Sequence, residues 1–279
     1  MKTEIEKKVN DSDSSFYWAM RLMPSKKRQA IFAVYAFCRE VDDVADGNLS
    51  NQEKANLIKF WRTEIENIYK GKPNTNLGKN LAIPIESFSL EKQDFMDILD
   101  GMELDIDPQF SLINVSELEN YCDKVACSVG RLSNDIFGLD KETGLALADC
   151  LGKALQLTNI LRDVNEDFQE GKIFLPQDLL ESHNGSLCEI KKNICHPSVA
   201  SSCRSIAKLA QYYYNNSRTI IESCDRKIVK PALLMMLVYE RLLNKLIKRN
   251  WSDMSESVRI NKIEKLWIIV KVNWGNSLN

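Results

Sequence analysis

The sequence predicts an all-α protein, and three observations support this. Apolar residues recur at intervals of three and four along most of the chain, which is the spacing of one helix face. Only 11 glycines and 7 prolines interrupt the 279 residues, and no alternating run with a hairpin turn indicates a strand. Because no repeat, low-complexity tract or linker divides the chain, we expect a single helical domain over residues 1–279.

The expected helices follow one another with short breaks. They cover residues 26–46, 51–69, 90–104, 116–137, 143–168, 198–223, 231–249 and 261–272. The first begins after Pro24 and ends at Gly47, a residue type typical of helix ends. Ser116 and Glu119 form a capping-box pattern at the start of the fourth. The stretch 176–197 predicts a less regular segment.

Charge and composition limit the classes of function. The formal net charge of -2 and the pI near 5.9 disfavour nucleic-acid binding, which needs a basic face. No window approaches the roughly 18 to 20 apolar residues of a membrane span. The eight cysteines form no C-x-x-C pair and the polar start lacks an apolar signal segment, so we expect free thiols in a cytoplasmic protein. We expect Glu103, Asp105 and Asp107 to form a solvated acidic turn.

Two acidic motifs end otherwise apolar helices. Asp42 and Asp46 lie one turn apart on one face, and Asp163 and Asp167 repeat this spacing. Negative charge at a helix C-terminus opposes the helix dipole, so this pattern needs compensation, for which bound cations are natural candidates. Two such ends facing each other would form a carboxylate-lined mouth that suits Mg²⁺, which also binds diphosphate oxygens. Two solvated helix ends are the alternative interpretation.

Polar side chains next to both motifs favour the functional interpretation. Arg39 lies one turn before the first motif. Gln156, Asn159 and Arg162 precede the second motif at intervals of three, on a helix that is otherwise apolar. Polar groups that interrupt an apolar run usually line a site. We therefore interpret the two motifs as one site.

At these residues the sequence resembles the squalene/phytoene synthase family. The segments that carry the similarity are 14–17, 35–46, 121–126, 128–130 and, most densely, 154–167. The resemblance covers most of the chain. It implies an isoprenoid-synthase fold, a single-domain helical bundle around a central hydrophobic cavity. Within the family, the chain is most similar to the bacterial branch that forms presqualene diphosphate for hopanoid biosynthesis.

The resemblance also implies roles for individual residues. The residues expected to hold Mg²⁺ are Asp42, Asp46, Asn159, Asp163 and Asp167. The four aspartates would be catalytic together with Arg162 and Lys124. The residues expected to bind substrate are Ser15, Phe16, Arg39, Gln156, Asn159, Lys172, Tyr239 and Arg259.

Three features depart from the family pattern. Lys124 stands where many relatives carry a second Tyr, and it resembles the basic residue of the presqualene-forming branch; alternatively it only holds diphosphate. Lys172 and Phe174 replace an Arg and a Tyr in a loop that the resemblance places over the site. Asn165 stands where relatives often have Gly, a change that a helix should accept.

The activity implied by the resemblance is head-to-head prenyl transfer. Two molecules of farnesyl diphosphate would condense to presqualene diphosphate with release of pyrophosphate. An NADPH-dependent squalene synthase, a phytoene or dehydrosqualene synthase, and a non-catalytic assembly factor with the same fold are the alternatives. An apolar product favours peripheral contact with the inner membrane surface, although no basic amphipathic helix is decisive in the sequence. Substrate chain length and oligomeric state stay open.

Overall fold

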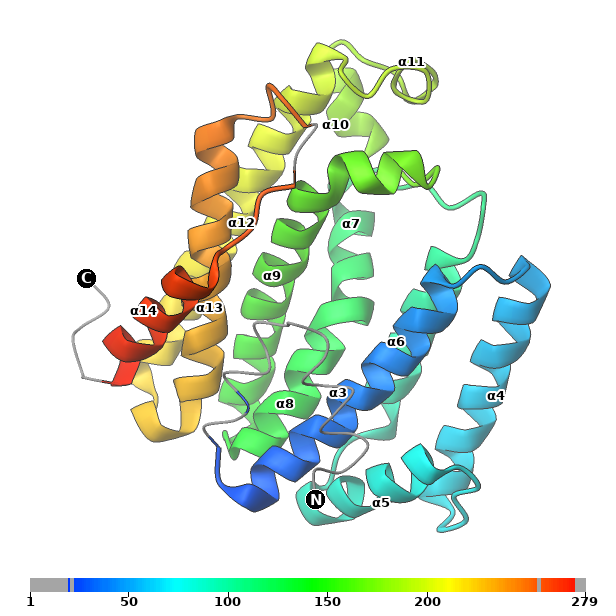
Figure 1. Cartoon of the computed structure of the whole chain (residues 1–279), viewed down its shortest axis with the longest axis vertical. Helices are drawn as coiled ribbons and strands as arrows, with labels where there is room; N and C mark the ends of the chain where they lie inside the picture. The colour runs from blue at the N-terminus through cyan, green and yellow to red at the C-terminus, as the bar shows by residue number, and fades with distance from the viewer. Residues whose placement is uncertain (1–19, 21–22, 255–256, 274–279) are drawn as a thin grey trace.

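The computed structural model describes residues 20, 23–254 and 257–273, and these form a bundle of helices without a β-strand in that part of the chain (Figure 1). The helices are α3 (Ser25–Asp46), α4 (Asn51–Tyr69), α5 (Asn76–Phe88), α6 (Lys92–Asp105), α7 (Val115–Cys122), the π-helical turn η1 (Asp123–Cys127), α8 (Ser128–Phe137), α9 (Lys141–Gln169), α10 (Gln177–Ser182), α11 (Leu187–Ile190), α12 (Pro197–Ser223), α13 (Arg226–Arg249) and α14 (Lys262–Asn273). The expected all-α class is confirmed. In the described part of the chain, no helix combines the length and the apolar character that a membrane span requires.

The helix boundaries differ from the prediction in several places. Helix α13 begins at Arg226, five residues before the expected start, with Pro231 inside it. Helix α5 was not predicted, because Gly78 and Pro84 within it weaken the helical signal. The expected cap at Ser116 is wrong, since Asn114 caps α7 and its side chain accepts a hydrogen bond from the backbone N–H of Glu117. The stretch 176–197 contains the two short helices α10 and α11.

Helix α9 is the central element of the bundle. It contacts α7, η1, α8, α12 and α13, and it runs through the middle of the molecule (Figure 1). Its end is a left-handed turn in which Gly171 has φ +81°. There the backbone N–H groups of Gly171 and Lys172 donate to the carbonyls of Phe168 and Asp167. This turn folds the chain back over the helix end, so Lys172 lies beside the second acidic motif.

The buried hydrophobic side chains form one continuous core among the described helices. Phe37 of α3 is fully buried and makes edge contacts with Trp61 of α4 and Phe95 of α6. Burying an aromatic side chain of this size contributes about 1.5–3 kcal/mol. Because α3 carries the first acidic motif, this packing also determines where that motif lies.

A buried carboxylate joins α4 to the start of α5. Glu64 is 1% exposed and accepts hydrogen bonds from the backbone N–H groups of Asn74 and Thr75 and from both of their side chains. Burial alone would raise the pKa of Glu64, but these hydrogen bonds lower it below its ordinary value. The Glu64 carboxylate thus accepts the hydrogen bonds that the N–H and O–H groups of the loop before α5 would otherwise make to water.

A π-helical turn interrupts the helix between α7 and α8. Two glycines on neighbouring helices make room for this wider turn. A Cβ atom on Gly101 of α6 would lie 2.4 Å from Val125 Cγ1, and one on Gly152 of α9 would lie 2.8 Å from the backbone of Cys127. The turn therefore fits tightly between α6 and α9, and its residues Val125 and Ala126 line the cavity described below.

We expect Gly152→Ala to destabilise the protein by roughly 1–2 kcal/mol, because the added methyl would meet backbone atoms that cannot move aside. Gly144→Ala on the same helix is the matched control, since its Cβ would find its nearest neighbours at ordinary distances of 3.5 and 3.7 Å. The control should gain up to about 1 kcal/mol in helix propensity. Urea unfolding of both variants measures the difference, and equal effects would contradict the tight fit.

We expect Glu64→Gln to cost about 1–3 kcal/mol at pH 7, because the loop donors lose a charged acceptor. Because the pKa of Glu64 is lower in the folded protein than in the unfolded chain, its ionised carboxylate stabilises the fold at any pH above the pKa of the unfolded chain. This stabilisation is lost as the pH falls from there through the pKa of the folded protein. The gap between wild type and variant should therefore shrink as the pH drops below about 4.5. Denaturant unfolding at several pH values tests this, with the exposed Glu86→Gln as control; a gap independent of pH would refute it.

Candidate active site

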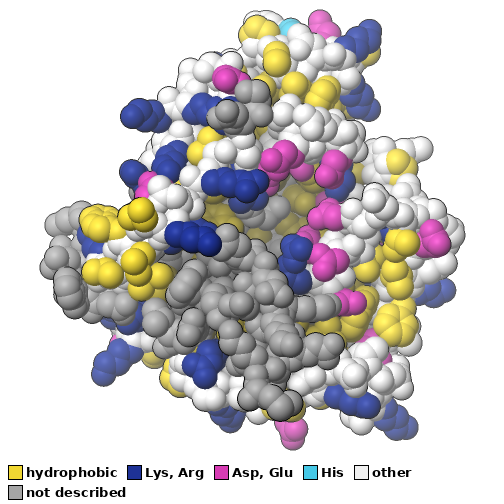
Figure 2. All heavy atoms as spheres, viewed as in Figure 1, with side chains coloured by type: hydrophobic (Ala, Val, Ile, Leu, Met, Phe, Trp, Pro, Cys, Tyr) yellow, Lys and Arg dark blue, Asp and Glu magenta, His cyan; other side chains and the backbone are white. Residues whose placement is uncertain are grey.

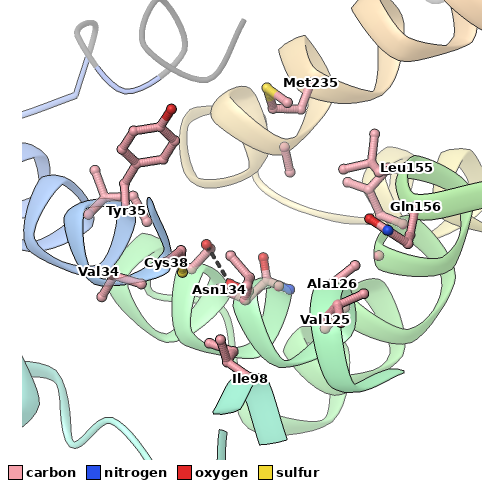
Figure 3. Close-up of a pocket in the computed structure, with 18 of the residues that line it drawn as sticks. Val34, Tyr35, Cys38, Ile98, Val125, Ala126, Asn134, Leu155, Gln156 and Met235 are labelled. Atoms are coloured by element: carbon pink, nitrogen blue, oxygen red, sulfur yellow. Dashed lines mark hydrogen bonds between the residues drawn. The ribbon is translucent and has the colours of Figure 1, made fainter. Parts of the chain in front are cut away.

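A cavity of about 320 Å³ lies between α3, α6, η1, α8, α9 and α13 (Figure 3). Apolar side chains from each of these elements line it, among them Val34, Ile98, Leu155 and Met235. Five of the predicted site residues also line it, namely Arg39, Asp42, Gln156, Asn159 and Tyr239. Figure 2 shows a hollow with a hydrophobic floor and with acidic and basic side chains at its margin. The cavity thus joins an apolar chamber to a charged mouth.

The first acidic motif lies at the C-terminal end of α3. Arg39 binds Asp42 at 2.6 Å and Asp43 at 2.7 Å, so one guanidinium is shared between two carboxylates of the same helix. Burial, followed by repulsion from Asp46, raises the pKa of Asp42 to about 6. Negative charge at this helix end is therefore only partly compensated by Arg39.

The second acidic motif lies near the C-terminal end of α9. Arg162 makes a two-pronged ion pair with its neighbour Asp163, at 2.6 and 2.5 Å. Burial, followed by repulsion from Asp163, raises the pKa of Asp167 to about 7. Burial raises the pKa of Tyr239 on α13, and the positive charge of Arg162 together with its hydrogen bond to the tyrosine opposes this rise. The second motif thus carries uncompensated negative charge, as the first does.

Lys172 connects the two motifs. Its Nζ lies 3.6 Å from Asp46 Oδ1 on α3 and 3.5 Å from Glu170 Oε2 at the end of α9. Its positive charge lowers the pKa of Asp42 and of Asp167, although the effects of burial and carboxylate repulsion are larger. The two helix ends are at least 117 residues apart in sequence, and through Lys172 they share one mouth.

Asp105 is a member of the mouth that the sequence analysis missed. The expectation of a solvated turn is wrong for this residue, because it is half-buried and accepts a hydrogen bond of 2.9 Å from the Tyr121 hydroxyl. Burial above all, and then the charges of Asp42 and Asp46, raise its pKa to about 7 against the effects of Tyr121 and Lys172. Glu103 and Asp107 are exposed as expected.

A signal for Asp105 was present in the sequence. It follows Ile98 and Met102, two cavity-lining residues of α6, by seven and three positions, so it continues their helix face. Tyr121, its partner, is buried against Phe174 with 5.2 Å between ring centroids. Phe174, where the family pattern has a Tyr, thus packs under the mouth and helps to hold the loop that carries Lys172.

Two predicted site residues contact groups outside the two acidic motifs. Lys124 forms an ion pair of 2.9 Å with Asp100 and is not among the cavity-lining residues, so its expected role at a diphosphate stays a prediction. Arg259 is exposed on the segment between α13 and α14, where its carbonyl accepts a hydrogen bond from Lys245. Ser15 and Phe16 lie outside the described residues.

The side-chain oxygens of the mouth suit a divalent cation. The side-chain oxygen of Asn159 is buried and has no hydrogen-bond partner among the described residues, while its nitrogen donates to Gln156 at 3.4 Å. A buried unpaired oxygen beside carboxylates with raised pKa values is what a site for a hard cation requires. Carboxylate and amide oxygens are also the ligands that Mg²⁺ prefers.

A second group of potential metal ligands, Asp123, Cys127 and Asp149, lies apart from the predicted metal site. Two of its members already have cationic partners, because Asp123 pairs with Arg131 at 2.8 Å and Asp149 with Lys153 at 2.6 Å. The thiol of Cys127 donates to the carbonyl of Asp149. We therefore interpret this group as a set of structural ion pairs.

Comparison with known proteins agrees with this arrangement. The family model for squalene/phytoene synthase matches residues 9–264. A presqualene diphosphate synthase of Zymomonas mobilis is 37% identical over 260 residues, covering 93% of this chain and 89% of the relative, and one of Sinorhizobium fredii is 36% identical over 258 residues, covering 92% of each. A solved structure of a dehydrosqualene synthase in complex with a ligand superimposes with a TM-score of 0.85 at 27% identity, covering 97% of this chain and 94% of that chain. The chain therefore belongs to the squalene/phytoene synthase family.

Proposed function

We propose that this protein is a prenyltransferase that joins two molecules of farnesyl diphosphate head to head, forming presqualene diphosphate and releasing pyrophosphate. The observation that carries the proposal is the meeting of two acidic helix ends at the mouth of an apolar cavity. The relatives named presqualene diphosphate synthase support the choice of product, because they match more than nine-tenths of the chain.

The two parts of a prenyl diphosphate match the two parts of the site. The apolar wall would take the hydrocarbon chains and exclude water from them. The mouth would take the diphosphates, with Arg39, Arg162 and Lys172 as the cationic side chains that face them. Gln156 and Tyr239 would contact the substrates from the cavity wall.

The oxygens of the mouth would hold Mg²⁺. The residues that we assign to this role are Asp42, Asp46, Asn159, Asp163 and Asp167, and Asp105 adds a further carboxylate beside them. Bound there, Mg²⁺ would neutralise the diphosphate and promote its departure. The packing of α3 and of α9 against their neighbouring helices would keep these ligands in place.

In the proposed reaction, the bonds that break and form all belong to the two substrate molecules. The C1–O bond of the donor breaks and pyrophosphate leaves with the electron pair, stabilised by the arginines and Lys172. The double bond of the acceptor attacks C1 of the donor, and loss of a proton closes the cyclopropane ring. Pyrophosphate is the nearest base that the reaction itself supplies. The apolar wall protects the allylic cation from water until the new bonds form.

The decisive test is the product formed by the purified protein. With farnesyl diphosphate and Mg²⁺, we expect a C30 diphosphate in equal amount with and without NADPH, identified by mass spectrometry. Squalene formed only with NADPH would move the assignment to a squalene synthase, and an NADPH-independent C30 hydrocarbon would move it to a dehydrosqualene synthase. Absence of product from both farnesyl and geranylgeranyl diphosphate would overturn the proposal.

We expect Asp42→Asn and Asp167→Asn to lower turnover at least about 100-fold, because each removes a charged ligand from the mouth. Without metal, the same variants should be as stable as wild type or more so, since the raised pKa values show that burial and neighbouring carboxylates oppose both charges.

Thermal unfolding with and without Mg²⁺ separates these two effects. Wild type should gain stability on adding Mg²⁺ and the two variants should gain much less. Asp107→Asn, which changes an exposed carboxylate outside the mouth, is the matched control and should behave like wild type. Loss of metal-free stability in the two variants would instead indicate a structural role for these aspartates.

A further inference from the structure

Helix α14 exposes a stripe of large apolar side chains. Ile263, Leu266, Trp267 and Val270 are 80%, 60%, 63% and 39% exposed. Their spacing of three and four residues places them on one face of the helix. The opposite face packs on the protein through the buried Ile268 and Val272. The helix is therefore held on the body of the protein by one face and presents a hydrophobic face to the outside.

The charged residues of helix α14 are one glutamate and three lysines. Its acidic residue, Glu264, points inward to α13, where it pairs with Lys245 at 2.6 Å and Arg241 at 3.1 Å. The three lysines of the helix are Lys262, Lys265 and Lys271. Lys271 lies over the ring of Trp267, with Nζ 5.6 Å from its centroid. By helical spacing, Lys265 shares the packed side with Ile268 and Val272, while Lys262 and Lys271 flank the apolar stripe. The outer side of the helix thus combines apolar side chains with two flanking positive charges, and the helix's one carboxylate is paired with cations of α13.

The stripe lies on the same face of the molecule as the cavity mouth. In Figure 2, hydrophobic side chains gather over α14 at the left, and the hollow with its acidic and basic margin opens toward the viewer in the same view. In Figure 1, the segment that leads into α14 runs across α9, the helix that carries the second acidic motif. A flat surface that contacts α14 would therefore lie near the entrance of the cavity.

We propose that α14 docks the protein on an anionic lipid surface. Leu266 and Ile263 would enter the boundary between headgroups and acyl chains, and Trp267 would sit at the headgroup level, where its amphipathic ring is favoured. The flanking lysines would attract anionic headgroups. This contact would bring the mouth to the membrane, where long prenyl chains and an apolar product reside; that last step rests on the proposed function.

Charge favours lipid over a second copy of the chain as the occupant. A symmetric dimer through α14 would bring the lysines of two identical helices together, which costs free energy. An anionic membrane supplies the opposite charge over a surface of any extent. The combination of aromatic, aliphatic and lysine side chains on a short helix is typical of an interfacial helix.

The experiment compares binding of the full chain to vesicles of phosphatidylcholine alone and of phosphatidylcholine mixed with phosphatidylserine, by flotation. We expect binding to the anionic vesicles that weakens as salt is raised. The double variant L266E/W267E should bind at least about tenfold more weakly. Ile83→Glu on α5 is the matched control, since Ile83 is 65% exposed and its change should leave binding unaltered.

Three outcomes would overturn the proposal: no binding to anionic vesicles, equal binding by L266E/W267E and wild type, or an equal loss in Ile83→Glu. Light scattering of the free protein identifies the competing occupant, because a dimer that L266E/W267E dissociates would assign the stripe to a second copy. Turnover of detergent-dispersed substrate should be the same in wild type and L266E/W267E. A failure of docking with normal turnover would thus leave the proposed function intact.

Discussion

Repulsion between carboxylates at the cavity mouth is the constraint to which the surrounding structure responds. Side chains from the ends of α3, α6 and α9 hold negative charges close together in a partly buried place. Burial above all, and then the neighbouring carboxylates, raise the pKa values of Asp42, Asp105 and Asp167. Arg39, Arg162 and Lys172 offset part of this charge. The packing of the helices supplies the rest of the stability, so the site is maintained against its own electrostatics, as is usual for functional sites.

The features that the sequence predicted well are local ones. Helix periodicity located most of the helices, and the acidic and polar residues of α3 and α9 located four of the residues that line the cavity, whereas Tyr239 on α13 came from the family resemblance. These signals depend only on spacing along one helix. The assignment to a family rests on the same segments, which is why the family and the fold class could be recognised together.

The features that the sequence did not predict depend on contacts between distant segments. The spacing of Asp105 from Ile98 and Met102 shows only which face of α6 it shares; its contacts with Tyr121 and with the charges of α3 come from distant segments. Lys124 pairs with Asp100 of α6 at 2.9 Å, a contact that the residues around Lys124 do not indicate. Helix α5 forms although its glycine and proline disfavour it, and Glu64 of α4 receives the donors of the loop before it.

The π-helical turn η1 has a consequence for how the shape of this cavity can vary. One additional residue in a helix changes the direction of everything that follows by about 100°. Helices α7 and α8 follow each other directly through η1. With this rotation between them, Tyr121 of α7 contacts Asp105, while Val129 and Ser133 of α8 line the cavity. Substitutions can retune the wall residue by residue. A gain or loss of one residue at η1 would instead rotate one of the two helices against the other, so a different set of side chains would line the cavity. The length of this turn therefore changes the shape of the cavity in steps.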